Sequence, residues 1–369
     1  MSQSESRFRP VIETMRGYAP GEWPTPEAGV LKLNSNENPY GPSPRVMAAL
    51  SNFSGELLRR YPDPLAKDFC HVVGKTFGIP ADWVIAGNGS DDVLTLIIRA
   101  CAEGVARPLA YPTPTYVLYR TLAAMQPAST IEIPYGDDWQ LPVAQLLATD
   151  AAVTLVATPN SPSGHVVPMA DLRALAQGLS GILVVDEAYV DFVEDEGDQA
   201  DLASLALVRD YDNVIVLRTL SKGYGLAGLR LGFGCAQPVL LEGLFKVKDS
   251  YNVDAIALHL ASAAIADQDY KRAIAQKVIS ARRQLTVDLQ GLGFRVWPSQ
   301  TNFLLVQPPA AADFGRSQYA QVLQQGLKER QIMIRYFNEP GLDDKLRITV
   351  GTPEQNVKVV TELKRLLLP

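Results

Sequence analysis

The chain has 369 residues, of which 47 % are hydrophobic and 20 % are charged, and it carries a net charge of −6. This balance is that of a globular protein with room for two or three modest domains. It argues against a nucleic-acid partner, because a phosphate backbone requires a basic face, but a few local arginines can still bind a small anion.

The N-terminus lacks the apolar core of a signal peptide, and no stretch holds the ~20 apolar residues of a membrane span. We therefore expect a cytoplasmic protein without a membrane partner. The three cysteines, Cys70, Cys101 and Cys235, lie far apart, and the three histidines lack metal-ligand spacing. This pattern predicts reduced thiols and no metal site.

Residues 1–44 are rich in Pro, Gly and Asn and predict an extended arm with turns. From residue 45, helical patterns alternate with short apolar runs at 153–158, 181–190, 213–218 and 229–236. Such alternation predicts a mostly parallel sheet covered by helices on both faces, in a large domain over 45–255. The long Ala-rich helical stretch and the mixed segments that follow predict a small α+β domain over 256–369, which includes a linking helix.

A glycine-rich run, TLSKGYGLAGLRLGF, occupies residues 219–233. Gly223, Gly225 and Gly228 match the G-x-G-x-x-G pattern of dinucleotide-binding turns, but in that turn a helix begins inside the glycines, whereas here a short strand-like segment follows. We therefore expect no dinucleotide. The alternative is that Lys222 forms a Schiff base, with glycines that let the backbone approach a flat cofactor.

Polar groups suited to a phosphate lie on both sides of this lysine. Thr219 and Ser221 offer hydroxyls and Arg230 offers a guanidinium fork. Upstream, GNGSDD (87–92) places a Gly-rich turn before a helix N-terminus, where backbone amides of Ser90 and Asp91 can bind the same anion.

Two further residues follow buried strands. Asp186 ends ILVVD, and a carboxylate at the C-terminal end of such a strand lies where α/β proteins bind ligands. There it can keep a pyridine nitrogen protonated, although a helix cap is the simpler role for Asp186 alone. Asn160 follows VTLVA and can donate a hydrogen bond to a phenolate oxygen.

Together these motifs make the chain similar to fold-type I pyridoxal 5′-phosphate (PLP) aminotransferases, and more narrowly to the histidinol-phosphate aminotransferase family. The similarity covers nearly the whole chain, through LNSNENPYGPSP (33–44), RYPDP (60–64), GNGSDD, YPTPTY (111–116), TPNSPSG (158–164), VVDEAYVDF (184–192), the glycine-rich run and LRITVGT (346–352). It implies a mostly parallel seven-stranded central sheet in the large domain, beside the small α+β domain.

The resemblance also implies roles for the matching residues. Lys222 would hold PLP as a Schiff base and move the Cα proton, and Asp186 would pair with the pyridine nitrogen. The ring would further be contacted by Tyr189 and Asn160 at its 3′ oxygen and by Tyr116 on its face. The phosphate would be held by Ser90, Asp91, Thr219, Ser221, Arg230 and, from the neighbouring subunit of a homodimer, Tyr61. The substrate pocket would be lined by Tyr18, Asn36, Asn160, Arg335 and Arg347.

The reaction that the resemblance implies is amino transfer from L-histidinol phosphate to 2-oxoglutarate in histidine biosynthesis. Three alternatives stay open: an aminotransferase of the same subfamily that acts on aromatic or other amino acids, a PLP decarboxylase of phosphate-anchored substrates, and a PLP-binding protein without turnover. The chain departs from the family pattern at Asp92, Thr158, Ser161, Ser163, His165, Gly223, Tyr224 and Ser250. These changes remove no expected catalytic group but alter loops near the pocket.

Overall fold

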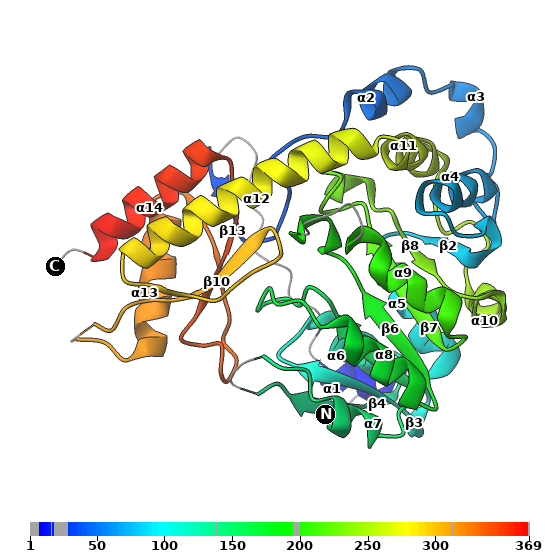
Figure 1. Cartoon of the computed structure of the whole chain (residues 1–369), viewed down its shortest axis with the longest axis horizontal. Helices are drawn as coiled ribbons and strands as arrows, with labels where there is room; N and C mark the ends of the chain where they lie inside the picture. Colours follow the sequence, from blue (N-terminus) through cyan, green and yellow to red (C-terminus); the bar gives the residue numbers. More distant parts are fainter. Residues whose placement is uncertain are drawn as a thin grey trace, which may run out of the picture.

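The computed structural model describes residues 7–15, 17, 29–136, 139–194, 200–311 and 313–367. Its larger part is built on a seven-stranded sheet (Figure 1). In spatial order the strands are β2 (Val84–Gly87), β8 (Gly232–Cys235), β7 (Val214–Thr219), β6 (Ile182–Asp186), β5 (Val153–Ala157), β3 (Gly104–Thr113) and β4 (Ala128–Pro134). Neighbouring strands from β7 to β4 are parallel, and only β8 is antiparallel to its neighbours. The predicted mostly parallel sheet is confirmed.

The central strands are apolar on both faces because helices cover both. Along β7, Val214 and Val216 belong to one hydrophobic cluster, whereas Ile215 and Leu217 belong to the other. The first cluster contains buried residues of α2 (Pro44–Ser51), α4 (Lys67–Phe77), α7 (Val143–Leu147), α8 (Met169–Gly178), α9 (Ala200–Asp210) and α11 (Ala255–Ile265). The second contains those of α5 (Ser90–Cys101), α6 (Leu118–Met125) and α10 (Pro238–Val247). Continuous apolar strands are typical of such a doubly covered parallel sheet.

The smaller part is an antiparallel sheet packed against helices, which agrees with the α+β expectation. Its strands are ordered β12 (Arg335–Tyr336), β13 (Leu346–Thr349), β10 (Phe303–Gln307) and β9 (Arg295–Val296). The helices are α12 (Gln268–Gly291), α13 (Arg316–Glu329) and α14 (Pro353–Leu367). In Figure 1, α12 runs from the larger part across the smaller one.

The N-terminal arm joins the smaller part. Strand β1 (Leu31–Lys32) pairs in parallel with β11 (Ile332–Met333), and Leu33 lies in the core of the smaller part. Two short helices complete the N-terminal region, α1 (Pro10–Thr14) and α3 (Gly55–Leu58). The arm therefore places Leu33 and Asn36 beside strands of the smaller part.

Helix α11 bears on the domain boundary predicted at 255/256. Its buried residues pack in the core of the larger part, and its main neighbours are α2 and α4. This packing favours a boundary between α11 and α12. The exact domain limits stay a prediction.

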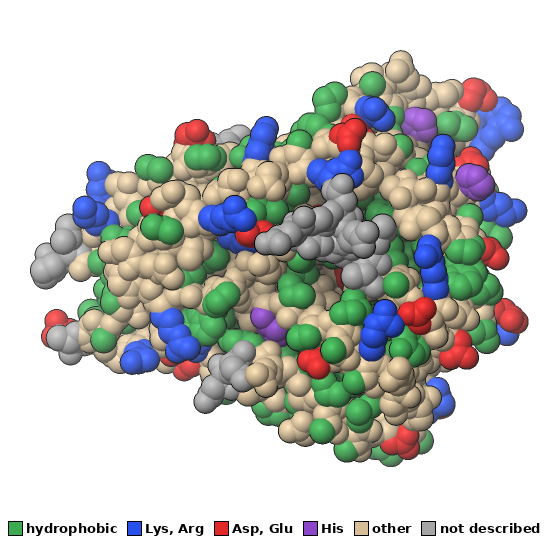
Figure 2. Space-filling model, viewed as in Figure 1, with side chains coloured by type: hydrophobic (Ala, Val, Ile, Leu, Met, Phe, Trp, Pro, Cys, Tyr) green, Lys and Arg blue, Asp and Glu red, His purple; other side chains and the backbone are tan. Residues whose placement is uncertain are grey.

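The surface shows no field of a single charge sign in the view of Figure 2, where acidic and basic side chains are interspersed. None of the helices in the described ranges combines the length and apolarity that crossing a lipid bilayer requires.

Candidate active site

The N-terminus of α5 forms a cradle of backbone amides beside the end of β7. Gly89 precedes the helix with φ +84°, and a Cβ there would lie 2.6 Å from Arg230 Nη2. A Cβ on Gly232 would lie 2.3 Å from the backbone nitrogen of Ser90. Only glycine at these two positions lets the guanidinium and the neighbouring strand approach the helix start.

Hydroxyl and guanidinium groups surround this helix start. The Thr219 and Ser221 hydroxyls lie 3.0 Å apart, and both residues are buried. Arg230 donates to Ser221 Oγ at 3.3 Å, and its Nη2 lies 3.6 Å from Asp91 Oδ2. The structure thus brings together all five residues of this chain that were predicted to hold a phosphate: Ser90, Asp91, Thr219, Ser221 and Arg230.

Lys222 follows this cradle and is half-buried. Its Nζ donates to the carbonyl of Ser35 at 3.3 Å and lies 5.9 Å from the centre of the Tyr189 ring. Asn38 donates to the backbone carbonyl of Lys222 at 2.9 Å. Two residues of the arm therefore contact the lysine, which a local sequence motif around Lys222 does not reveal.

Asp186 lies at the C-terminal end of β6 and is 4 % exposed. Tyr119 donates to its Oδ2 at 2.7 Å, and the backbone amide of Ala188 donates to Oδ1 at 3.1 Å. Burial raises the pKa of the Asp186 carboxyl to about 6, although the Tyr119 hydrogen bond opposes this effect. No cationic side chain among the described residues pairs with Asp186.

Tyr189 and Asn36 connect the arm to the larger part. Asn36 Nδ2 donates to the Tyr189 hydroxyl at 2.8 Å. Thr349 Oγ1 donates to Asn36 Oδ1 at 3.1 Å, and Asn302 donates to the carbonyl of Asn36 at 2.9 Å. The predicted substrate residue Asn36 therefore holds the predicted cofactor residue Tyr189 in place.

Asn160 is completely buried, and its carboxamide is already hydrogen-bonded. Its Nδ2 donates to the Pro114 carbonyl at 3.2 Å and to Ser163 Oγ at 2.9 Å, while Oδ1 accepts from Thr115 at 2.7 Å. The Pro114 carbonyl can only accept, which fixes the orientation of the amide. A hydrogen bond from Asn160 to a cofactor oxygen stays a prediction. Both N–H groups of Nδ2 are already used, so one of them would have to be shared with the cofactor.

Ser163 extends this chain of hydrogen bonds to His165, one of the departures from the family pattern. Ser163 Oγ lies 2.6 Å from His165 Nδ1. Burial lowers the pKa of His165 to about 4, so the ring is neutral near pH 7. Ser163 Oγ therefore accepts from Asn160 and also shares a hydrogen bond with Nδ1 of the neutral ring.

Tyr116, predicted to stack on the ring, lies between Asp91 and Tyr119. Its hydroxyl donates to Asp91 Oδ1 at 3.3 Å, and its ring packs edge-to-face on that of Tyr119 with centroids 5.7 Å apart. Tyr116 therefore borders both the phosphate cradle and Asp186.

The two arginines predicted to bind substrate are direct neighbours across two strands. Arg335 on β12 pairs in register with Arg347 on β13. Their guanidinium carbons lie 5.7 and 5.5 Å from the centre of the Phe337 ring. Arg347 also donates to Ser161 Oγ at 3.0 Å and to the Asn34 carbonyl at 3.1 Å. Within the described residues Arg335 forms no ion pair, so this end of the site suits an anion.

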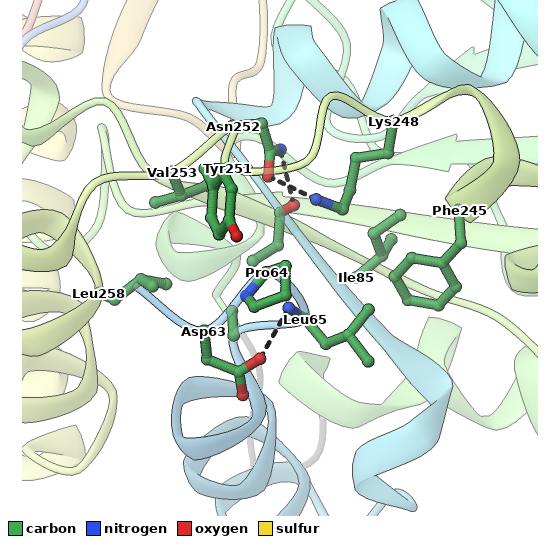
Figure 3. A pocket seen from close by; sticks show the side chains of 12 residues that line it. Asp63, Pro64, Leu65, Ile85, Phe245, Lys248, Tyr251, Asn252, Val253 and Leu258 are labelled. Atoms are coloured by element: carbon green, nitrogen blue, oxygen red, sulfur yellow. Dashed lines mark hydrogen bonds between the residues drawn. The ribbon is translucent and has the colours of Figure 1, made fainter. Parts of the chain in front are cut away.

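Tyr61 lies apart from the phosphate cradle of its own chain. It is 80 % exposed and its ring stacks on Tyr251, with centroids 4.4 Å apart. Both tyrosines line a cavity of about 470 Å³ that also reaches Asn88, next to the cradle. Figure 3 shows Tyr251 and Asn252 beside the turn at Asp63 to Leu65. The remaining predicted residue, Tyr18, lies outside the described residues.

Sequence reasoning missed Tyr119, Asn38 and Thr115. Asn38 and Thr115 lie within the motifs LNSNENPYGPSP and YPTPTY, so those motifs could have indicated them. Tyr119 carries no such signal, because a buried tyrosine in an amphipathic helix looks like an ordinary core residue.

Comparisons with known proteins agree with this geometry. The model of the family "Aminotransferase class I and II" matches residues 28–363. The chain is 57 % identical over 360 residues to histidinol-phosphate aminotransferase 1 of Trichormus variabilis, which covers 98 % of this chain and 99 % of that protein. It is 42 % identical over 351 residues to the histidinol-phosphate aminotransferase of Rhodopirellula baltica, which covers 95 % and 92 % of the two chains.

A solved structure extends the agreement to three dimensions. The crystal structure of histidinol-phosphate aminotransferase from Sinorhizobium meliloti in complex with pyridoxal-5′-phosphate has a TM-score of 0.86 and 26 % identity to this chain. The similarity covers 99 % of this chain and 98 % of that one. The chain therefore belongs to the aminotransferase class I and II family of PLP-dependent enzymes, and within it groups with the histidinol-phosphate aminotransferases.

Proposed function

We propose that this protein transfers the amino group of L-histidinol phosphate to 2-oxoglutarate, with PLP as its cofactor. The observation that carries the substrate assignment is the pair Arg335 and Arg347, which places two guanidinium groups side by side at the edge of the small domain. A guanidinium fork matches a phosphate and a carboxylate alike, so one pocket can bind both substrates in turn.

The residues present fit PLP. A cradle for its phosphate is formed by the amides at the start of α5, two hydroxyls and Arg230. A Cβ at Gly89 or Gly232 would collide with this cradle. Buried Asp186 has no cationic partner in the described part of the chain, so a protonated pyridine nitrogen would supply one. The amine of Lys222 lies 5.9 Å from the centre of the Tyr189 ring.

When bound, PLP supplies a carbonyl for an amine and an electron-withdrawing ring that acidifies the substrate Cα–H bond. We assign Lys222 Nζ as the group that anchors the cofactor and then accepts and returns the Cα proton. Asp186 keeps the pyridine nitrogen protonated, and Tyr189, held by Asn36, donates to the 3′ oxygen. Tyr116 covers the ring, and the cradle fixes the phosphate while substrates exchange.

We further propose that the active enzyme is a cytoplasmic homodimer in which Tyr61 binds the phosphate in the neighbouring subunit. The exposed ring of Tyr61 and the cavity beside Asn88 support this placement. Mixing Tyr61→Phe with Lys222→Ala protein tests it, because a hybrid dimer then holds one site without either change. Absence of activity above that of the parent variants in such hybrids would contradict a shared site.

The substrate is tested with half-reactions in a spectrophotometer. The PLP-loaded protein is mixed separately with histidinol phosphate, glutamate and phenylalanine, and the absorption of the bound cofactor is followed. We expect histidinol phosphate to convert the cofactor at a concentration about a hundredfold lower than phenylalanine, because only the former offers a phosphate to the arginines. Equal or better conversion by phenylalanine identifies an amino-acid aminotransferase, and CO₂ release without an acceptor identifies a decarboxylase.

A further inference from the structure

Tyr119 on α6 places a phenol hydroxyl in an otherwise apolar core. The side chain is 0 % exposed and belongs to the hydrophobic cluster between α5, α6 and the sheet. A buried hydroxyl without a partner is costly, and here it donates to Asp186 Oδ2 at 2.7 Å. Burial, followed by the nearby Asp186 charge, raises the pKa of Tyr119 well above its usual value, so the phenol keeps its proton and acts as the donor.

The carboxylate of Asp186 is held from both sides by neutral donors. Tyr119 binds Oδ2, and the amide of Ala188 binds Oδ1 at 3.1 Å. Both bonds together prevent rotation of the carboxylate. Of the effects that favour its charged form, the Tyr119 hydrogen bond is the largest, and it opposes the burial that raises the pKa.

The other charged groups near Asp186 do not replace this donor. Asp91 on α5 and the adjacent Glu187 are themselves acidic and raise its pKa. Arg218 on β7 is committed to Glu187, with Nη2 2.8 Å from Oε2. Among the described residues, the phenols of Tyr116 and Tyr135 also affect the Tyr119 hydroxyl.

Tyr119 also contacts the residue that covers the cofactor ring. Its ring packs edge-to-face on Tyr116, with an interplanar angle of 82°, and on Tyr111, with an angle of 61°. Tyr119 thereby contacts both Asp186, which we place at the pyridine nitrogen, and Tyr116, which we place on the ring face.

We propose that Tyr119 is a positioning residue for the cofactor, which keeps the Asp186 carboxylate ionised and aimed at the pyridine nitrogen and keeps Tyr116 against the ring. This inference rests on the proposed function. Because Tyr119 contacts Asp186 and Tyr116, we expect its effect on the cofactor to be transmitted through them, above all through Asp186.

The test uses Tyr119→Phe, which removes the oxygen and keeps the ring. Tyr111→Phe is the matched control, because Tyr111 is also buried and donates to a carboxylate, Glu132, at 2.8 Å. We expect Tyr119→Phe to bind PLP about tenfold more weakly in an absorption titration, since one hydrogen bond to a charged group is lost. We also expect the pH midpoint of the bound cofactor's spectrum to shift, and no change in either property for Tyr111→Phe.

A second readout needs no cofactor. The pKa of Asp186 is about 6 in the folded protein and lies above its unfolded value, so its contribution to stability is present at low pH and is lost as the pH rises through 6. Tyr119→Phe raises that pKa further and extends the loss to higher pH. The gap in melting temperature between wild type and Tyr119→Phe should therefore widen from pH 5 to pH 8, whereas the gap for Tyr111→Phe should stay constant.

The Asp186→Asn background separates positioning from packing. There the effect of Tyr119→Phe on PLP affinity should disappear, and an effect of unchanged size would overturn the proposal. If Tyr119→Phe alone fails to fold, rescue of folding in the Asp186→Asn background supports the proposal and failure of both overturns it. If Tyr119→Phe has the same PLP affinity and stability profile as Tyr111→Phe, this inference alone is overturned. A failure of the proposed function would instead appear in the half-reactions of the wild-type protein.

Discussion

The two ends of the active site are built in different ways. The end that we propose for the cofactor comes from segments at the C-terminal ends of strands of a single sheet, over residues 87–91, 186–189 and 219–232, with glycines that let backbone approach backbone. The end that we propose for the substrate is assembled from three separate parts: the arm at 34–38, the turn at 160–165 and the strand pair β12 and β13. The proposed cofactor end thus lies within the larger part of the molecule, whereas the proposed substrate end combines residues of the arm, of the larger part and of the smaller part.

The largest expected effect separates chemistry from this scaffold. Lys222→Ala should lower kcat by more than about 10⁴-fold, because the anchoring amine and the proton acceptor are both lost. PLP should still bind through the phosphate cradle, and the melting temperature should change little. Lys246→Ala is the control, since that side chain is 71 % exposed on α10. Full activity of Lys222→Ala would refute the whole assignment.

A change at the cofactor end tests whether the cradle is rigid. Gly232→Ala inserts a Cβ 2.3 Å from the Ser90 nitrogen and 2.8 Å from the Arg218 carbonyl, and neither backbone atom can yield easily. We expect a loss of about 2 kcal/mol in the free energy of unfolding and about thirtyfold weaker PLP binding. Gly228→Ala in the same loop meets no atom within 4 Å and should change neither. Equal behaviour of the two variants would show that the cradle deforms readily.

At the substrate end, Arg335→Ala should act on the substrate and spare the cofactor. We expect KM for histidinol phosphate to rise about thirtyfold, from the loss of a charge-assisted contact, with PLP affinity unchanged. Arg295→Ala provides the control, because Arg295 also stacks on an aromatic ring of the small domain, Trp297 at 4.5 Å, but lies on β9. A loss of PLP affinity in Arg335→Ala would mean that the two ends are not independent.

The same contrast explains what the sequence could predict. The cradle residues are specified by short motifs whose backbone geometry is local, so the sequence could indicate Ser90, Asp91, Thr219, Ser221 and Arg230. The structure brings them together, and their binding of a phosphate stays a prediction. Arg335 and Arg347 were identified as single residues, but their pairing depends on a strand register that no local pattern encodes. Tyr119 and the hydrogen bonds of Asn160 arise from long-range packing between α6, β6 and the 160–165 turn, which is decided only when the sheet forms.

The smallest predicted effect concerns the point where the two ends meet. Asn160 belongs to the cofactor end by its predicted bond and to the substrate end by its turn, and Ser163 holds its amide at 2.9 Å. Ser163→Ala removes one neutral hydrogen bond that supports the Asn160 amide, so we expect kcat/KM to fall roughly fivefold. Ser163→Thr, which keeps the hydroxyl, should keep wild-type activity. If Ser163→Ala instead strengthened PLP binding, the freed amide of Asn160 would be the better donor to the cofactor, and the Ser163–His165 pair would be a restraint on that bond rather than a support for it.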